Sequence, residues 1–373
     1  MAGSFVVDQK ILLSILSAMQ PICSKRTTID ATSSILFQVG HKELILKSTD
    51  LEISLQATCE INDSSFTDQQ SFLVSGKRIF DLVKELEGAI ECSLDNQRFS
   101  LRSGGAHLNL NIKDIESFPP FPERIENLTH FEASFLIELL EKVAFLIPQN
   151  NANPSLNGLF LEFSSEGLMM TTTDGHCLAQ IKTNKYTLEE NKQWLIPRRA
   201  IFEIKKIVEN TDNSEVFLGV CGNQLVFSGE TFNFFTKLLA DQFPQYQAIL
   251  QKTDFLPATL DREQFIKTLR RSSCLLSGQF LATRFAFDKN ALKVSMENKE
   301  VGTLNEELSL QKFDGAELDI RFYAPYLLNG LQSFEEKEVT FYLKNATKPI
   351  IFEANKPEYH VTYLVMPVSP TTN

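Results

Sequence analysis

The sequence predicts an α+β protein of three similar domains, in each of which two helices pack on antiparallel sheets. Two observations carry this prediction. Apolar residues change repeatedly between helical spacing and the two-residue alternation of strands along the 373 residues. The order of these segments restarts after roughly 125 residues, and the pairs Phe118–Pro119, Phe243–Pro244 and Met366–Pro367 recur at that interval. A period of this length is that of whole domains, which we place at residues 1–126, 127–254 and 255–373.

The first third shows the order of elements most clearly. Apolar residues at helical spacing predict two helices, and Gly88 ends the second. Their apolar positions are Ile11, Leu12, Ile15, Leu16 and Met19 in the first helix, and Ile79, Phe80, Val83 and Leu86 in the second. The expected strands are Ile35–Val39, Leu44–Leu46, a strand through Leu51, Ile53 and Leu55, then Ile90–Leu94, Phe99–Leu101 and Leu108–Ile112.

The other two thirds repeat this order. In the second, helices are expected around Phe135–Val143 and Ile201–Val208, with strands at Leu159–Phe163 and Leu168–Thr172. In the third, helices are expected around Phe265–Leu269 and Tyr326–Leu331. The strands expected there are a hairpin through Phe285, Phe287, Leu292, Val294 and Met296, followed by Val339–Leu343 and Ile350–Glu353.

Composition bounds the class of protein. The net charge of −11 argues against a tail that grips nucleic acid by bulk charge, and 43% hydrophobic residues with 30 Phe can fill sizeable cores. The six cysteines are scattered singly without metal-ligand spacing, so we expect a reduced cytoplasmic protein with no metal and no cofactor. No stretch approaches the roughly 20 apolar residues that span a bilayer, and no targeting segment is recognised.

The segment Thr171–Leu178 combines a strand end, an Asp174–Gly175 turn and a second strand, a strong signal for a hairpin. Two interpretations are open. Asp174 and His176 could form an acid/base pair, or Asp174 could make the turn while His176 lines a wall. The sequence contains no phosphate-binding loop, no zinc motif and no nucleophile elbow. Binding is therefore favoured over catalysis.

Basic residues cluster on helices of an acidic protein, at the second predicted helix of the first and second thirds and the first predicted helix of the last. They could simply be a solvated helix face, but their recurrence in all three thirds indicates a shared role. The residues are Lys77, Arg78 and Lys84 in the first third, Arg198, Arg199, Lys205 and Lys206 in the second, and Lys267, Arg270 and Arg271 in the third.

Together these features resemble the bacterial sliding clamp family, the beta subunits of the DNA polymerase III holoenzyme. The resemblance runs in order over the full length. It is carried by Thr49–Asp50–Leu51–Glu52, Leu156–Asn157–Gly158, Thr173–Asp174–Gly175–His176, Ile196–Pro197–Arg198, Phe243–Pro244–x–Tyr246 and Tyr363–Leu364–Val365–Met366–Pro367. It implies a head-to-tail homodimeric ring of six similar clamp domains, whose helices line a hole for duplex DNA and whose closed contact is heterologous.

The resemblance also implies sites. Partners, namely the replicative polymerase, the clamp loader and other clamp-binding proteins, would insert a hydrophobic peptide into a groove formed by Leu156, Thr173, Gly175, His176, Leu178, Pro244, Ile249, Leu364, Val365, Met366 and Pro367. DNA-facing residues would be Arg26, Lys77, Arg78, Arg198, Arg199, Lys205, Lys206, Lys267, Arg270 and Arg271. The dimer interface would use Leu108, Leu110, Leu275 and Leu276. The resemblance implies that the protein is a polymerase processivity factor without catalytic activity. Asp174 would then form the turn, and His176 would line the wall of the groove.

The chain departs from the family pattern near the implied groove. Cys177 stands where the family has Arg, and Gln245, Gln247 and Ala248 replace an Asp and paired Arg. The chain also continues through residues 369–373. These changes make the groove less basic.

Two other functions compete with a clamp, namely a hydrolase using Asp174 and His176, and a scaffold that binds peptides but no DNA. Light scattering discriminates, because a clamp should be a dimer.

Overall fold

The computed structural model describes residues 3–24, 27–95, 97–122, 125–210, 214–276 and 282–368. It divides into two compact units. Unit 1 comprises Met1–Ile137 and Arg199–Leu238, and unit 2 comprises Glu138–Arg198 and Leu239–Asn373.

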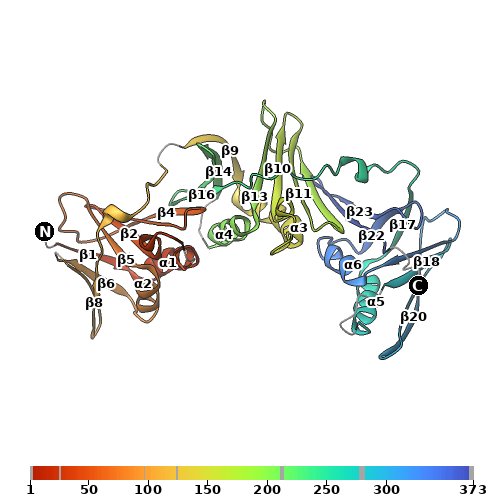
Figure 1. Cartoon of the computed structure of the whole chain (residues 1–373), viewed down its shortest axis with the longest axis horizontal. Coiled ribbons are helices and arrows are strands. Elements are labelled where there is room, and N and C mark those ends of the chain that lie inside the picture. Colours follow the sequence, from red (N-terminus) through yellow and green to blue (C-terminus); the bar gives the residue numbers. More distant parts are fainter. Residues whose placement is uncertain are drawn as a thin grey trace. The chain divides into compact units, whose positions relative to one another are not determined.

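The predicted threefold repeat is confirmed as one order of elements: strand, helix, four strands, helix, three strands (Figure 1). The first repeat contains β1 (Gly3–Asp8), α1 (Gln9–Cys23), β2 (Ser34–Val39), β3 (Glu43–Thr49), β4 (Ile53–Glu60), β5 (Gln70–Ser75), α2 (Gly76–Val83), β6 (Ala89–Leu94), β7 (Arg98–Ser103) and β8 (Ala106–Asn111).

The second repeat contains β9 (Glu126–Glu132), α3 (Ala133–Val143), β10 (Gly158–Ser164), β11 (Gly167–Thr173), β12 (Cys177–Thr183), β13 (Lys192–Pro197), α4 (Arg198–Glu209), β14 (Glu215–Cys221), β15 (Gln224–Ser228) and β16 (Phe232–Lys237). The third contains β17 (Leu256–Asp261), α5 (Arg262–Cys274), β18 (Thr283–Phe287), β19 (Ala291–Asn298), β20 (Gly302–Ser309), β21 (Leu318–Phe322), α6 (Ala324–Leu331), β22 (Glu338–Leu343), β23 (Ile350–Asn355) and β24 (His360–Val365).

The strands form four sheets, and two of these sheets cross the boundaries between repeats. The four-stranded sheets have the orders β1-β6-β7-β8 and β20-β19-β18-β21. The eight-stranded sheets have the orders β5-β2-β3-β4-β16-β15-β14-β9 in unit 1 and β13-β10-β11-β12-β24-β23-β22-β17 in unit 2. Two antiparallel pairs make the crossings: β4 with β16, and β12 with β24.

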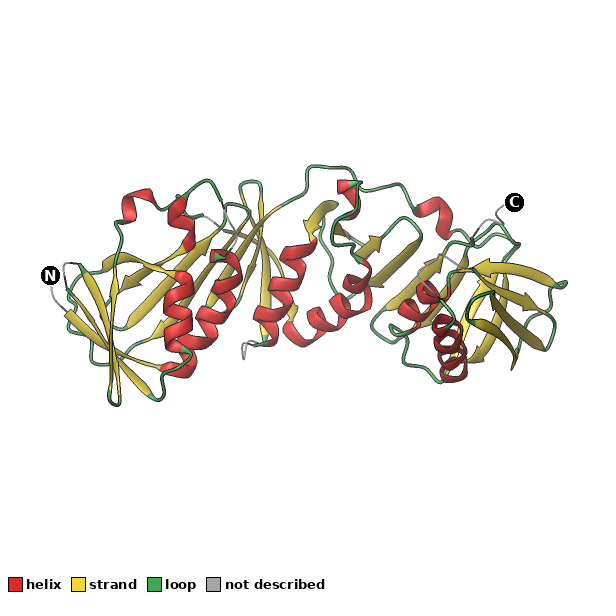
Figure 2. Ribbon diagram, turned by 60° about the horizontal axis from the view of Figure 1, so that its bottom comes forward, coloured by secondary structure: helices red, strands yellow, loops and turns green. Residues whose placement is uncertain are grey.

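In the first and third repeats, the helices pack on strands of their own repeat. The N-terminus of α1 is capped by Asp8, whose Oδ1 accepts bonds from the amides of Lys10 at 2.9 Å and Ile11 at 3.2 Å. Its apolar positions Leu12 and Leu16 are buried, and α1 contacts α2, β3 and β4. In the third repeat α5 contacts α6 and β20 (Figure 2).

Phenylalanine rings fill the space between the two sheets of the first repeat. Phe5 and Phe99 come from one sheet, and Phe37 and Phe72 from the other. Phe72 lies 5.1 Å from Phe99 and 5.4 Å from Phe37 between ring centroids, distances typical of favourable aromatic pairs.

The strand expected through Leu51, Ile53 and Leu55 is wrong at its start. β4 begins at Ile53, while Leu51 lies in the β3–β4 turn with a φ of 76°. The Asp50 carboxylate accepts bonds from the amides of Glu52 at 3.0 Å and Ile53 at 2.8 Å, and this bonding holds the turn. Turn chemistry therefore overrides the apolar alternation at Leu51.

Candidate functional site

The Thr173–Leu178 segment is a hairpin turn held by its own side chains. The Asp174 Oδ1 atom accepts bonds from the amides of His176 at 2.8 Å and Cys177 at 2.7 Å. The Thr173 hydroxyl donates to the Cys177 carbonyl at 2.6 Å, and Gly175 has a φ of 94°, which favours glycine. The same arrangement recurs in the β3–β4 turn, where Asp50 takes the place of Asp174.

This geometry favours the turn interpretation over the acid/base pair. The His176 ring stacks on Tyr326, with centroids 5.5 Å apart and planes inclined by 17°. Within the described ranges, no hydrogen bond or ion pair joins the Asp174 carboxylate to that ring. A general base must be oriented by its partner, and here the carboxylate orients the backbone instead.

Nucleophilic chemistry is also disfavoured at three buried cysteines, Cys23, Cys59 and Cys177. Burial raises the pKa of the Cys23 and Cys59 thiols to about 12, and it raises the pKa of the Cys177 thiol as well. A nucleophilic cysteine needs a lowered pKa, so these thiols act as small apolar side chains.

The C-terminal segment is docked, as its apolar composition predicts. β24 pairs with β12, so that Leu364 faces Leu178 and Val365 faces Cys177. The Met366 amide donates to the His176 carbonyl at 2.9 Å and thereby extends the pairing past the strand. Leu364 and Val365 are interior residues, with 2% and 0% of their surface exposed.

One hydrophobic cluster brings several of the predicted groove residues together. Leu178 and Leu364 belong to it with Phe243 and Tyr246, and Met366 packs against it. We call this group, with the exposed Pro244, the exposed Ile249 and the half-buried Pro367, the cluster surface. Of the other predicted groove residues, Leu156 is buried, and its Cδ1 lies 3.8 Å from the position of a Cβ built on Gly175. Thr173 is half-buried and His176 is exposed.

A polar row that is buried except at Gln193 lies beside this cluster, and the sequence interpretation missed it. The Tyr246 hydroxyl donates to Glu162 Oε2 at 2.5 Å, and Gln193 Nε2 donates to Glu162 Oε1 at 3.2 Å. Burial raises the pKa of Glu162, while the bonds from Tyr246 and Gln193 oppose the rise. The available signal was a charged residue inside the apolar strand β10, where only a partnered Glu is expected.

The predicted basic residues differ in their surroundings. Lys77, Arg78, Lys206, Lys267, Arg270 and Arg271 are exposed, whereas Arg198, Arg199 and Lys205 are half-buried. Four of them form ion pairs: Lys205 with Glu209 at 2.7 Å, Lys206 with Glu203 at 4.0 Å, Arg271 with Glu306, and Arg199 with Asp50. Arg26 lies outside the described residues, as do residues 369–373.

Arg198 and Arg199 make structural contacts. The Arg198 Nε donates to the Ile147 carbonyl at 2.9 Å. Arg199 forms an ion pair with Asp50, whose side chain is fully buried, and its Nη2 donates to the Pro21 carbonyl at 3.0 Å. Within unit 1, Arg199 therefore ties α4 to the β3–β4 turn.

Replacing Arg199 with Ala should remove the Arg199 ion pair from the buried Asp50 carboxylate. Breaking such a pair typically costs about 3–5 kcal/mol, and we expect the lower end because Arg199 is 31% exposed. Denaturant unfolding would measure the loss, with Lys206→Ala on the same helix as the matched control. An unchanged midpoint in Arg199→Ala would show that the pair contributes nothing.

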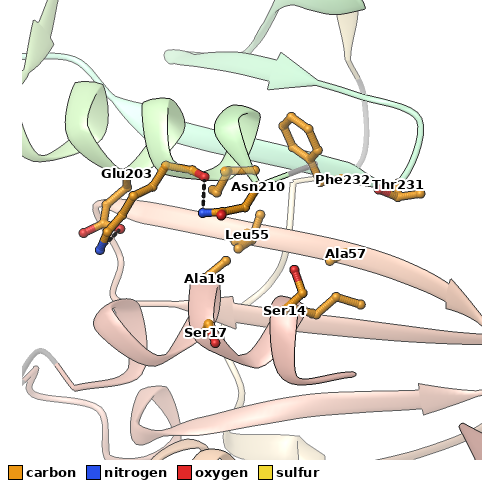
Figure 3. Close-up of a pocket in the computed structure, with 12 residues that line it drawn as sticks. Ser14, Ser17, Ala18, Leu55, Ala57, Glu203, Asn210, Thr231 and Phe232 are labelled. Carbon is orange, nitrogen blue, oxygen red and sulfur yellow. Dashed lines mark hydrogen bonds and ion pairs between the residues drawn. The ribbon is translucent and has the colours of Figure 1, made fainter. Parts of the chain in front are cut away.

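A cavity of about 310 Å³ lies in unit 1 between α1 and α4, over β4 and β16 (Figure 3). Asn210 donates to the Lys206 carbonyl at 2.8 Å on its rim. Its lining residues are Ser14, Ile15, Ser17, Ala18, Leu55, Ala57, Glu203, Lys206, Ile207, Asn210, Thr231 and Phe232. The cavity thus lies beside one of the basic residues predicted above, Lys206.

Two of the predicted interface residues lie on a sheet edge, and the other two lie at the end of a helix. β8 is the edge strand of its sheet, and its Leu108 and Leu110 are half-buried. Leu275 caps the C-terminal end of α5, and its carbonyl accepts a bond from Asn298 at 2.6 Å. Both Leu275 and Leu276 are half-buried.

The described part of the chain contains no group of three or more His, Cys, Asp and Glu residues that could hold a metal ion. No helix in these ranges is long and apolar enough to cross a membrane.

Three family models match the chain consecutively. They describe the N-terminal domain of the DNA polymerase III beta subunit at residues 3–122, its central domain at residues 130–245 and its C-terminal domain at residues 250–369.

Individual proteins match over nearly the whole chain. A beta sliding clamp of Pseudomonas putida is 27% identical over 371 residues, covering 98% of this chain and 99% of that protein. Solved sliding clamps of Pseudomonas aeruginosa and Bacillus subtilis each superpose with a TM-score of 0.90, at 24% and 22% identity, covering 99% of this chain and 100% of theirs.

Proposed function

The chain belongs to the family of DNA polymerase III beta subunits, the bacterial sliding clamps, and on that premise we propose which of its surfaces perform the role of a polymerase processivity factor. That role follows from family membership. Members of this family generally act without catalysis of their own, and we propose the same for this chain in the cytoplasm, with no metal and no cofactor. The proposed partners are duplex DNA, the replicative polymerase subunit, the clamp loader and other proteins that carry a clamp-binding peptide.

The pattern of bridging strands supports a closed ring of two copies. The third strand after the first helix of one repeat pairs with the last strand of the next repeat, as β4 with β16 and β12 with β24. By the same rule β20 lacks a successor and β8 lacks a predecessor, and both are sheet edges among the described strands. We propose that β20 of one copy pairs with β8 of the other, which closes a head-to-tail ring.

Side chains at these edges fit the proposed seam. Leu108 and Leu110 lie on one face of β8, and Leu304 and Leu308 on one face of β20. Leu308 is already buried, and pairing the edges would also bury the half-buried Leu108, Leu110 and Leu304 and satisfy the unpaired backbone groups that otherwise invite aggregation. We assign Leu275 and Leu276 to the same seam, because α5 contacts β20.

DNA contact is proposed for exposed cations on the helices, chiefly Lys77, Arg78, Lys267 and Arg270. Sparse Lys and Arg residues facing phosphates attract duplex DNA without reading its sequence, and salt screens that attraction. Arg198, Arg199 and Arg271 already contact protein groups, so we expect them to contribute less.

Replacing Lys77, Arg78, Lys267 and Arg270 with Ala should lower the salt dependence of DNA binding. Each phosphate contact removed should reduce the slope of log K against log salt by roughly one. The slope is measured by titrating duplex DNA between about 50 and 200 mM salt. The matched control removes four exposed lysines from loops, Lys42, Lys289, Lys312 and Lys348, and equal slopes in both variants would contradict the assignment.

Partner binding is proposed for the cluster surface. An apolar site in which polar groups are few and Met366 can adapt its shape suits hydrophobic peptides of more than one sequence. The recurrence of the bridging pairs is the observation that carries the clamp proposal as a whole. Its test is retention: the protein loaded by a clamp loader should stay on circular DNA and leave when that DNA is linearised. Equal loss from both forms would contradict encirclement.

A further inference from the structure

Residues 239–243 are fixed to the sheet of unit 2 at two places. The Leu239 amide donates to the Leu195 carbonyl of β13 at 2.9 Å. The Phe243 ring stacks on Phe160 of β10, with centroids 4.8 Å apart and planes inclined by 9°. Both contacts hold the part of the segment that precedes Pro244.

Beyond Pro244 the segment is held by one polar side chain, Tyr246, which reaches a row across four adjacent strands. Gln193 of β13 faces Glu162 of β10, and Thr171 of β11 faces Gln180 of β12. The Tyr246 hydroxyl donates to Glu162 at 2.5 Å and accepts from the Thr171 hydroxyl at 3.3 Å. Gln193 donates to Glu162 at 3.2 Å, and Gln180 donates to Thr171 at 2.9 Å.

Burying this polar row against the sheet costs more free energy than apolar packing would. Tyr246 is 5% exposed and Glu162 is 9% exposed, and an apolar pair of similar size would avoid burying a carboxyl group. Hydrogen bonds are directional, so the Tyr246 hydroxyl can bond to the polar side chains of the row at one position only. An aromatic ring without a hydroxyl could shift over apolar neighbours. The row is therefore suited to fixing where residue 246 sits.

We infer that Glu162 and Tyr246 are positioning residues for partner-peptide binding, because their hydrogen bond fixes the segment that carries Pro244 and Ile249. The Ile249 amide donates to the Tyr246 carbonyl at 3.0 Å. The position of Tyr246 therefore constrains the position of Ile249. Tyr246 also shares a cluster with Leu178 and Leu364. The inference rests on the function proposed for the cluster surface.

Four variants separate positioning from simple stabilisation. Tyr246→Phe removes the hydroxyl, and Glu162→Gln keeps an acceptor for it. Glu162→Leu removes the acceptor, and Glu162→Leu with Tyr246→Phe replaces the pair by apolar groups that leave no buried carboxyl group unpartnered. The probe is a fluorescein-labelled hydrophobic peptide derived from the replicative polymerase, titrated by anisotropy against the full-length protein.

We expect Tyr246→Phe and Glu162→Leu to weaken peptide binding about tenfold, and Glu162→Gln to stay within about threefold of the unmodified protein. The double variant should regain the melting temperature lost by Glu162→Leu or Tyr246→Phe but not the affinity. Hydrogen exchange should rise at residues 246–250 in the weakened variants and stay unchanged in β14–β16. Unmodified affinity in Tyr246→Phe, or affinity that returns with stability in the double variant, would overturn the inference.

A further variant distinguishes a wrong positioning role for Glu162 and Tyr246 from a wrong assignment of peptide binding to the cluster surface. Met366→Lys alters the cluster surface itself without touching Glu162 or Tyr246. If Met366→Lys abolishes binding while Tyr246→Phe does not, only the positioning role is wrong. If Met366→Lys leaves binding unchanged, the peptide does not use the cluster surface, and both proposals fall.

Discussion

Replacing Leu108 and Leu110 with Lys is expected to convert the protein from a dimer into a monomer of 42.3 kDa. Both leucines lie on one face of the edge strand β8, which we propose to pair with β20 of a second copy. Two lysines would place charge inside an apolar seam, and charged side chains on edge strands are a common barrier to strand pairing. Light scattering on a sizing column at micromolar concentration measures the mass.

The matched control uses the opposite face of the same strand. His107→Lys with Asn111→Lys adds the same charge at exposed positions and should leave the dimer intact. Leu275→Ala with Leu276→Ala tests the other side of the seam and should also give a folded monomer. Circular dichroism establishes folding in each case. A dimer that survives both leucine changes would remove β8 and α5 from the interface.

Removing residues 366–373 is expected to weaken binding of the polymerase-derived peptide strongly while the protein remains a folded dimer. This cut takes away Met366 and Pro367 and keeps β24 complete through Val365. The shorter cut, which removes only residues 369–373, should change affinity by less than about threefold. We expect the longer cut to weaken binding about a hundredfold, because a few central apolar residues usually supply most of the binding energy.

The position of the longer cut matters. A cut before Leu364 would remove two interior residues that pair with both β12 and β23, so lost binding would then report lost structure. The cut before Met366 also removes the bond from the Val368 amide to the Arg321 carbonyl, which has a length of 2.8 Å. Arg321→Ala keeps that backbone carbonyl, so it is a suitable control for side-chain effects in this region. Peptide affinity equal to that of the full-length protein would exclude Met366 and Pro367 from the site.

Local patterns predicted most of the elements, because hydrophobic period and capping act over short stretches. α1 was expected from its apolar spacing, and the turn at Asp174 from its dipeptide. Leu51 was placed wrongly because alternation continued through a residue that the Thr49 and Asp50 side chains hold in a left-handed turn.

Long-range contacts account for what the sequence could not predict. Tyr246 and Glu162 are 84 residues apart, and no periodicity links them. Arg199 was grouped with the basic helix residues because its pairing with the buried Asp50, 149 positions away, leaves no local signal. The joining of β4 to β16 was equally hidden, since strand pairing between repeats depends on tertiary contact. The assignments of DNA-facing, interface and groove residues stay predictions.

Each eight-stranded sheet contains strands of two repeats, so the boundaries of the sequence repeat differ from the boundaries of the folded sheets. A fragment cut at the limits of the central repeat would keep β16 without β4 and β12 without β24. Each cut would expose the backbone groups of a strand that is interior in the whole chain, and such raw edges template aggregation. The central repeat should therefore be insoluble when produced alone, although its sequence looks self-sufficient. The boundaries of a soluble fragment should therefore be chosen so that paired strands stay together, even where these boundaries differ from the limits of the sequence repeat.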